Sequence, residues 1–192
     1  MEAAPKRLKT FLQNQKLIEI YTQSEETFSV GRVVRVGDTG FAVKSVDEQG
    51  RECGYAYFTV QSVRAIEEDT EYLEKLESYG RFWKSRGKDG ACPAEEDVFG
   101  EDAPEGLLSG ILSRQFFGKH VVLLGYRDRP EADAGYLLKL QERKLVLRQV
   151  DVSSGCFLDD VTAELDQIVF VEFGSVDNRL LEYANRELEG GL

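Results

Sequence analysis

Apolar and polar residues alternate in five short stretches of the first third of the chain, as they do in strands with one buried face. In residues 16–22 (KLIEIYT), Ile18 and Ile20 alternate with Glu19. Turn-like segments such as GDTG and DEQGRE separate the stretches. The pattern predicts five strands, at residues 16–22, 28–36, 40–47, 54–60 and 63–67.

The same pattern returns in the second half of the chain. Residues 16–47 lie over residues 120–151 without a gap, and their apolar positions coincide. One inserted residue after that segment brings residues 60–66 over 165–171. Because an internal repeat constrains a fold more than any single propensity does, the sequence predicts two copies of one small β unit in tandem.

Gly31 and Gly135 lie at matching positions inside the second strand of each copy. Glycine destabilises a strand interior unless a bulge, a bend or a close backbone approach requires it. We therefore expect a sharply bent second strand. Such a bend allows five short strands to close into a barrel, which removes exposed sheet edges.

Amphipathic patterns with helical spacing flank each copy. A linker rich in glycine and charge lies between the copies, and Trp83, Val98 and Phe99 are expected to anchor it. The predicted helices are at residues 5–14, 69–79, 104–117 and 176–188. The predicted organisation is a first barrel at residues 1–80, a linker at 81–103 and a second barrel at 104–192.

The stretch SVGRVVRVGDTGFAVKSVD, residues 29–47, resembles the signature of the Sm-like fold, a small SH3-type barrel. That signature has a glycine on strand two, then apolar alternation, and an aspartate ending strand three. A closer resemblance is to small bacterial Sm-like barrels of unassigned role, with a final helix such as EYLEKLESY, residues 71–79. The resemblance implies a mainly β fold with flanking helices, made of two tandem five-stranded Sm-like barrels.

The residues that Sm-like RNA binders use are not found at the matching positions. Those proteins place an asparagine shortly after the aspartate and an arginine–glycine pair between strands four and five, whereas EQG follows Asp47 and VSS follows Asp151. The net charge of −11 also disfavours RNA, because backbone binding depends on Lys and Arg that neutralise phosphates. RNA is therefore only the alternative partner, and no DNA partner is expected.

Composition indicates a soluble globular protein, with 42% hydrophobic and 31% charged residues. No segment approaches the roughly 18 uninterrupted apolar residues of a membrane span, and the N-terminus lacks a signal-peptide core. We expect a cytoplasmic protein with no membrane partner. Its three cysteines include no C-x-x-C pair, so neither a metal nor another cofactor is expected.

Asp47 and Asp151 occupy equivalent turns and are candidates for a duplicated ligand site. The alternative, which we favour, is that each caps its turn by hydrogen bonds to the backbone. Tyr55 and Tyr57 on strand four are candidates for stacking on a base or filling a partner's groove. Packing is favoured over binding, with one tyrosine facing outward and the other flanking the core.

Trp83, Lys84 and Arg86 belong to RFWKSRGK, the one dense basic and aromatic segment of an acidic chain. They are candidates for RNA contact, with the indole stacking on a base, or for docking the linker on the acidic barrel surface. The single histidine, His120, has no nucleophile context around it, so no catalytic residue is assigned.

These observations favour a non-enzymatic cytoplasmic binding or assembly protein, because a scaffold is repeated while no catalytic set is found in either copy. A protein partner, or self-association through barrel edges, is expected. An RNA-associated protein that uses the barrel face or the basic linker is the alternative. An enzyme with an unrecognised carboxylate or metal site is the third hypothesis.

Overall fold

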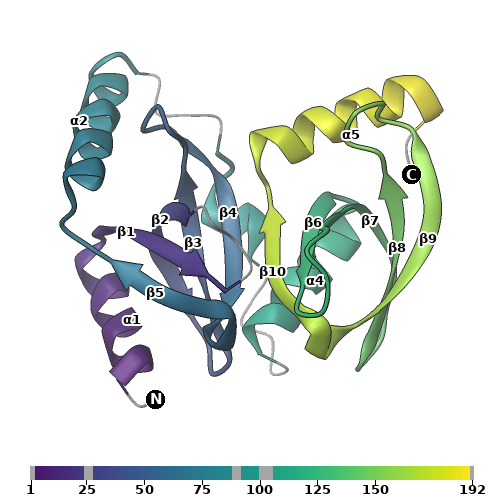
Figure 1. Cartoon of the computed structure of the whole chain (residues 1–192). Coiled ribbons are helices and arrows are strands. Elements are labelled where there is room, and N and C mark those ends of the chain that lie inside the picture. The colour runs from purple at the N-terminus through teal and green to yellow at the C-terminus, as the bar shows by residue number, and fades with distance from the viewer. Residues whose placement is uncertain (1–2, 24–27, 88–91, 100–105, 191–192) are drawn as a thin grey trace. The chain divides into compact units, whose positions relative to one another are not determined.

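The computed structural model describes residues 3–23, 28–87, 92–99 and 106–190 (Figure 1). The chain divides into two compact units, Met1–Cys92 (unit 1) and Pro93–Leu192 (unit 2). Each unit has five antiparallel strands with a helix before and a helix after them. The expectation of a mainly β fold with flanking helices is therefore confirmed.

Unit 1 follows the predicted alternation closely. Its strands pair in the order β5-β1-β2-β3-β4, and a 3-10 turn, η1 (Val60–Ser62), connects the last two strands along the chain. Its elements are α1 (Ala3–Asn14), β1 (Leu17–Thr22), β2 (Phe28–Val36), β3 (Gly40–Val46), β4 (Glu52–Thr59), β5 (Val63–Glu67) and α2 (Glu71–Ser85).

Unit 2 has the same succession of elements, preceded by one short extra helix. The strand order within it is β10-β6-β7-β8-β9, again with a 3-10 turn, η2 (Leu165–Gln167), before the last strand. Its elements are α3 (Glu95–Val98), α4 (Leu107–Gly118), β6 (Val121–Tyr126), β7 (Asp133–Leu140), β8 (Lys144–Val150), β9 (Phe157–Glu164), β10 (Ile168–Phe173) and α5 (Val176–Glu189).

The two units share their strand registers as well as their element order. Ile18 pairs with Gly31 in unit 1, and Val122 pairs with Gly135 in unit 2. The glycines are required by a close approach of the next strand: a Cβ would lie 2.7 Å from the Lys44 carbonyl oxygen at Gly31 and 2.1 Å from the Arg148 carbonyl oxygen at Gly135. Both second strands also shift register a few residues later.

The expectation of closed barrels is not met. In the described part of each unit, the pairings leave β4 and β5, or β9 and β10, at opposite edges of a five-stranded sheet, with no pairing between them. The 3-10 turn connects these edge strands without bringing their backbones into hydrogen-bonding register. Each sheet is therefore open.

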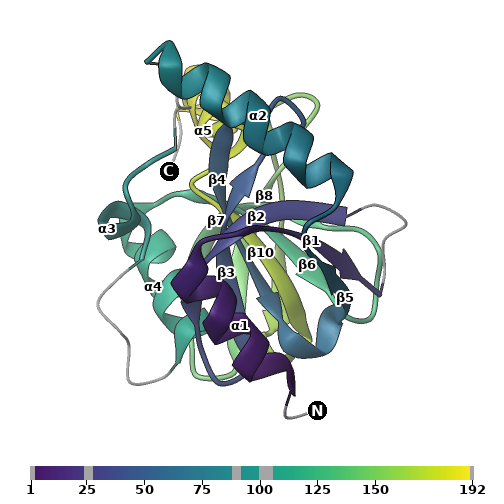
Figure 2. The same cartoon turned by 90° about the vertical axis from the view of Figure 1, so that its left-hand side faces the viewer.

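A helix packs on each of two faces of the unit 1 sheet (Figure 2). Leu73 and Leu76 of α2 pack with Leu17 and Val30. Ile18 and Ile20 point to the opposite face because side chains alternate along a strand, and they are fully buried. Here α1 packs against β2. In unit 2, α5 packs against β6 and α4 against β7.

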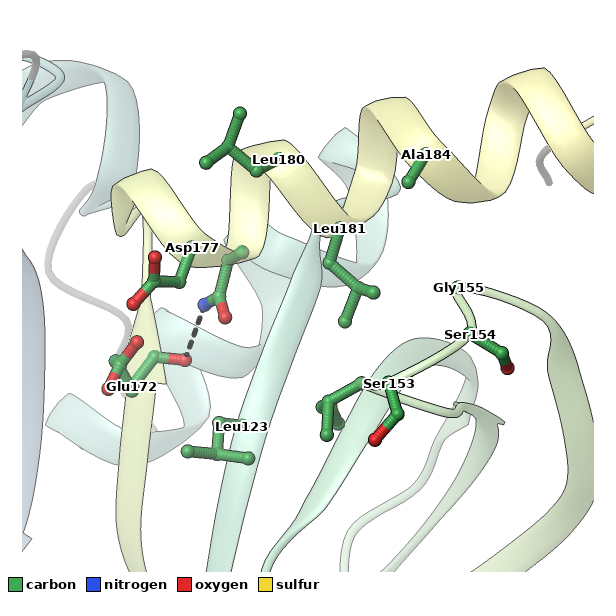
Figure 3. Close-up of a pocket in the computed structure, with 12 residues that line it drawn as sticks. Leu123, Ser153, Ser154, Gly155, Glu172, Asp177, Leu180, Leu181 and Ala184 are labelled. Atoms are coloured by element: carbon green, nitrogen blue, oxygen red, sulfur yellow. Dashed lines mark hydrogen bonds between the residues drawn. The ribbon is translucent and has the colours of Figure 1, made fainter.

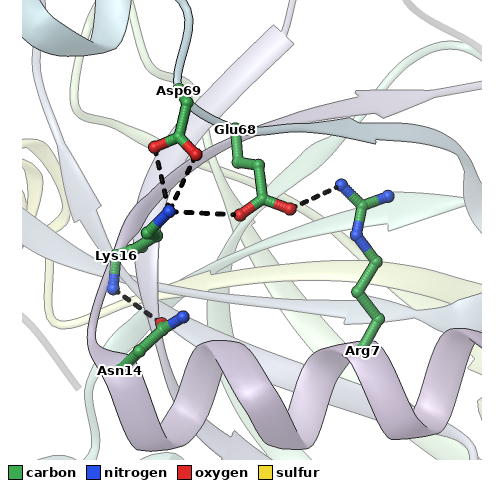
Figure 4. A network of polar contacts seen from close by, with 5 residues as sticks. All are labelled: Arg7, Asn14, Lys16, Glu68 and Asp69. Carbon is green, nitrogen blue, oxygen red and sulfur yellow. Dashed lines mark hydrogen bonds and ion pairs between the residues drawn. The ribbon is translucent and has the colours of Figure 1, made fainter.

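Ion pairs connect the start of the unit 1 sheet to its end (Figure 4). Lys16 Nζ lies 2.8 Å from Asp69 Oδ2 and 3.6 Å from Glu68 Oε2, while Arg7 of α1 lies 3.1 Å from the other Glu68 oxygen. The Asn14 side chain accepts a hydrogen bond from the Lys16 backbone N–H. These contacts fix α1 against the connection between β5 and α2.

The predicted linker at 81–103 overlaps described elements of both units. Helix α2 extends to Ser85, and unit 2 begins at Pro93. Val98 and Phe99 are buried, and Gln115 donates a hydrogen bond to the Val98 carbonyl oxygen. Residues 88–91 and 100–105 of the predicted linker lie outside the described residues.

Among the described helices, none is both long enough and apolar enough to cross a membrane.

Candidate functional site

Helices α2 and α5 start in the same way, which aligns them residue by residue. The Thr70 hydroxyl accepts the Leu73 N–H at the start of α2, and the Ser175 hydroxyl accepts the Asn178 N–H at the start of α5. Side-chain caps of this kind satisfy backbone donors that a helix leaves unpaired. From these caps, Tyr72 of unit 1 corresponds to Asp177 of unit 2.

In unit 1, three aromatic rings fill the space between the first half of α2 and the sheet. The Tyr21 and Phe28 ring centroids lie 5.1 Å apart, and Phe28 meets Tyr72 edge to face at 5.3 Å. Phe28 and Tyr72 pack against the buried cluster of Leu17, Val30, Leu73 and Leu76. This group of Tyr21, Phe28 and Tyr72 is called the unit 1 plug.

A buried carboxylate joins the unit 1 plug to the helix. Glu19 is 3% exposed and accepts hydrogen bonds from the Tyr21 hydroxyl at 2.7 Å and from the Thr70 hydroxyl. The hydrogen bond to Glu19 raises the pKa of Tyr21 to about 12. Tyr21 therefore remains a neutral donor, and the start of α2 is held onto a filled interface.

In unit 2 the equivalent region is only partly filled. Gly125 stands in place of Tyr21, Ala132 in place of Phe28 and Asp177 in place of Tyr72. Phe170 of β10 covers Gly125, where an added Cβ would lie 3.0 Å from the Phe170 Cβ, so the volume is lost mainly beside Asp177. A pocket of about 580 Å³ lies here, within the roughly 300–1,000 Å³ of ligand sites. We call it the unit 2 pocket (Figure 3). It is lined by Leu123, Ala134, Val152, Ser153, Ser154, Gly155, Glu172, Asp177, Asn178, Leu180, Leu181 and Ala184.

Two carboxylates stand on one side of the unit 2 pocket. Figure 3 shows Glu172 of β10 and Asp177 of α5 together, across the pocket from Ser153 and Ser154. Burial raises the pKa of Glu172, a hydrogen bond with Ser175 opposes that shift, and the Asp177 charge adds to it. The Asn178 side chain donates to the Glu172 carbonyl oxygen at 3.2 Å. Within the described residues no cation is paired with Glu172.

The rim of the unit 2 pocket is apolar and exposed. Leu180 is 60% exposed on α5, and Val152 is 68% exposed on the turn after β8. That turn is joined to α5 by a hydrogen bond from the Asn185 side chain to the Gly155 carbonyl oxygen at 2.9 Å. A Cβ at Gly155 would lie 3.4 Å from the Ala184 Cβ, whereas one at the equivalent Gly50 would lie 2.6 Å from the Tyr79 Cβ. The small residues Gly155 and Ala184 thus keep the pocket mouth wide.

Asp47 and Asp151 cap their turns, as the favoured interpretation predicts. Asp47 accepts the Gln49 and Arg51 backbone N–H groups at 2.9 and 2.8 Å. Asp151 accepts the Ser154 hydroxyl at 2.8 Å and the Ser154 N–H at 2.7 Å, and these bonds lower the pKa of Asp151. The carboxylates shape the turns, and the turn of Asp151 forms one wall of the unit 2 pocket.

The expectation that Tyr55 or Tyr57 faces outward is wrong. Both lie on β4 and both are 0% exposed. Residues two apart on a strand point to the same face, so these side chains share one environment. Burial raises the pKa of Tyr57, while a hydrogen bond with Thr39 opposes the shift. Neither ring is available for stacking on a ligand from solvent.

Trp83, Lys84 and Arg86 lie at the end of α2. The Trp83 indole N–H donates to the Gln49 carbonyl oxygen at 2.8 Å, and the Arg51 guanidinium lies 5.8 Å from the indole ring. Trp83 therefore fastens α2 to the turn that Asp47 caps. Lys84 and Arg86 are exposed, and their contact with RNA stays a prediction.

The pocket residues were not identified from the sequence, although a signal for them exists. Alignment of the copies draws attention to positions that match, such as Gly31 and Gly135. The pocket lining includes positions that differ, where Val30, Tyr72 and Tyr79 of unit 1 are replaced by Ala134, Asp177 and Ala184. A search for lost side-chain volume between the copies would have found it.

Comparison of the chain with protein-family models, with curated proteins and with solved structures found no match. In the described residues, no group of three or more His, Cys, Asp or Glu side chains is placed to hold a metal ion. The functional argument therefore rests on the unit 2 pocket itself.

Proposed function

We propose that the chain is a non-enzymatic binding and assembly protein built from two Sm-like units. In this proposal unit 1 is a packed scaffold, and the unit 2 pocket holds an apolar group that carries a positive charge. The Sm-like assignment is supported by the resemblance of residues 29–47, by the glycine on each second strand and by the 3-10 turn before each fifth strand.

The main support for the proposal is a difference between the two units: the interface under α2 is packed with aromatic rings, whereas a pocket lies beside α5. In unit 1 the plug of Tyr21, Phe28 and Tyr72 packs under α2. In unit 2 Asp177 replaces Tyr72, and a pocket of about 580 Å³ lies beside it, with Leu, Ala and Val side chains in its lining. A ligand ring in this pocket would bury apolar surface, which stabilises a complex by about 2 kcal/mol for a side chain of this size.

The positive charge follows from Glu172 and Asp177. A carboxylate whose pKa is raised by burial is poorly solvated when ionised, and a nearby cation favours its charged form. An ammonium or guanidinium group of the ligand would supply that cation. Binding should therefore strengthen as the pH rises through the pKa of Glu172.

The proposal is tested with three probes of similar size and different charge: 2-phenylethylammonium, 2-phenylethanol and phenylacetate. Ligand-observed NMR on the full chain should rank their affinities in that order, with the cation bound most tightly. A small probe of about nine heavy atoms is expected to bind with a dissociation constant on the order of millimolar. Equal binding of the three probes, or none, would overturn the proposal.

Matched variants locate the binding site. Asp177→Tyr places in unit 2 the residue that stands in the unit 1 plug, so it should abolish binding of all three probes. Glu172→Gln should remove most of the preference for the cation while keeping the apolar contribution. Glu187→Tyr, an exposed position on α5 away from the pocket lining, is the control and should leave binding unchanged. Undiminished binding to Asp177→Tyr would place the site elsewhere.

A further inference from the structure

An exposed row of side chains on α2 is chemically complementary to the unit 2 pocket. Lys75, Tyr79, Phe82 and Arg86 follow one another at spacings of three and four residues, which places them on one helix face. We call this row the α2 stripe. Tyr79 is 43% exposed and Phe82 is 50% exposed, although both are large and apolar.

The charges of the α2 stripe lie close to aromatic rings. Lys75 Nζ lies 4.2 Å from the Tyr72 ring centroid and 5.9 Å from that of Tyr79, and the Arg86 guanidinium lies 5.2 Å from that of Phe82. The stripe therefore presents aromatic surface together with positive charge. The unit 2 pocket presents apolar walls together with Glu172 and Asp177. The groove of unit 1 that also holds carboxylates, Glu52 and Glu77, has both of them in ion pairs with Lys44 and Arg32.

We propose that the α2 stripe of one copy docks into the unit 2 pocket of a second copy, with the Phe82 ring as its apolar anchor. This inference rests on the proposed function, because it names the occupant of the same pocket. The two surfaces are different, so the contact is head to tail, and each added copy presents a new stripe and a new pocket. Association should thus continue beyond a dimer, as a ring or an open chain.

The expected association is weak and depends on salt. A single ring in a pocket of about 580 Å³, with two flanking cations, makes a contact smaller than the interfaces of stable dimers. A dissociation constant on the order of 100 µM is expected. Because exposed charges are screened at higher ionic strength, the association should weaken severalfold between about 50 and 500 mM salt.

Sedimentation equilibrium of the full chain provides the test. The wild-type average mass should rise with concentration and exceed that of a dimer. Phe82→Ser removes the anchor from an exposed position, and Asp177→Tyr fills the pocket, so each variant alone should be monomeric. Their equimolar mixture should form a dimer and stop there, because only one intact stripe and one intact pocket remain. Tyr183→Ser, which removes another exposed aromatic residue (61% exposed) from α5, is the matched control and should associate as the wild type does.

Arg86→Glu is a second stripe variant that keeps the Phe82 ring, and it should weaken association at least tenfold. A wild-type chain that stays monomeric at several hundred micromolar overturns the inference, and the cationic probe then decides the proposed function separately. Association that survives both Phe82→Ser and Asp177→Tyr also overturns it, in favour of pairing through sheet edges. Association that is lost in Phe82→Ser but unchanged in Asp177→Tyr also overturns the inference, because the α2 stripe would then bind a surface other than the unit 2 pocket.

Discussion

The interfaces under α2 and α5 have the same backbone design and opposite distributions of side-chain volume. Tyr21, Phe28 and Tyr72 pack together under the first half of α2, whereas the unit 2 pocket lies beside the first half of α5. In unit 2 the aromatic residues lie elsewhere under the helix. Tyr136 and Phe157 pack in the cluster that includes Leu181 of α5, with ring centroids 6.2 Å apart.

In unit 1 the positions of those two rings hold Arg32 and Glu52, which line a smaller groove of about 300 Å³. Ion pairs occupy this groove: Arg32 lies 2.9 Å from Glu77, and Glu52 lies 2.5 Å from Lys44. A common scaffold thus accommodates a cavity at different places beside the same helix, because its aromatic residues occupy different positions in the two units. The function of each unit therefore depends on a few side chains rather than on the fold.

The largest expected effect comes from truncating the equivalent leucines of the two helices. Leu76→Ala should destabilise unit 1 by about 3 kcal/mol, because Leu76 is 1% exposed in a filled interface and its loss leaves a cavity. Leu181→Ala should cost about 1 kcal/mol, because Leu181 already faces the unit 2 pocket. Native-state hydrogen exchange of the α2 and α5 amides measures both values. Equal costs would mean that the two interfaces are packed alike.

Glycine substitutions on the two capped turns should differ by a smaller amount. Gly50 and Gly155 both have positive φ, +77° and +74°, so alanine at either position is strained by about 1 kcal/mol. At Gly50 the new Cβ would also lie 2.8 Å from the Leu76 carbonyl oxygen, so Gly50→Ala should cost about 2 kcal/mol. Denaturant unfolding followed by Trp83 fluorescence reports on unit 1, and amide exchange reports on unit 2. A larger loss at Gly155 than at Gly50 would contradict the wider mouth of the unit 2 pocket.

The buried carboxylate of the pocket should give unit 2 a distinctive pH dependence. The pKa of Glu172 is raised above its unfolded value of about 4.5, so its contribution to stability is present below that pH and is lost as pH rises through the folded pKa. Glu172→Gln should therefore stabilise unit 2 at pH 7 by up to about 1 kcal/mol and flatten its pH profile above pH 4. The control is Glu67→Gln, at the equivalent exposed position on β5 of unit 1. The same gain in both variants would show that burial in unit 2 is not the cause.

The smallest effect is expected at the start of the first strand of each unit. His120 Nδ1 lies 3.4 Å from Glu182 Oε1, and this contact raises the pKa of His120. Its stabilisation is present below about pH 6.5 and is lost as the pH rises through the folded pKa. Because His120 is half exposed, the change should stay under about 0.5 kcal/mol.

The equivalent residue in unit 1, Lys16, pairs with Asp69 and keeps its charge through that pH window (Figure 4). Amide exchange of α5 between pH 5.5 and 8.5, in wild type and His120→Asn, measures the effect of His120. A loss of protection in α2 over the same window would contradict the assignment.

The sequence was sufficient to predict the strands and the turns. Apolar alternation placed β1 and β2 within one residue of their observed bounds, because a strand with one buried face repeats every two residues. The capping roles of Asp47 and Asp151 followed from the chemistry of short acidic side chains in turns. Ungapped alignment of the copies also reproduces the observed registers, such as Val33 with Val43 and Leu137 with Leu147.

The alternation of apolar and polar residues did not predict how the sheets end, which side chains are covered or where the pocket lies. Alternation does not specify whether the edge strands of a sheet meet, so the open sheets were predicted as closed barrels. Aromatic residues occupy both faces of β4, so the pattern did not reveal that Tyr55 and Tyr57 are both covered. The unit 2 pocket is lined by Ala134, Asp177 and Ala184, where unit 1 has larger side chains, and such missing volume becomes visible only once the partners of each position are known.

An amide-resolved NMR titration with 2-phenylethylammonium can show whether unit 2 binds a ligand beside α5 where unit 1 is packed. We expect concentration-dependent shifts at the pocket residues Leu123, Gly155 and Ala184, with none at their unit 1 equivalents Glu19, Gly50 and Tyr79. Shifts that cluster in unit 1, or that spread equally over both sets of amides, would contradict it.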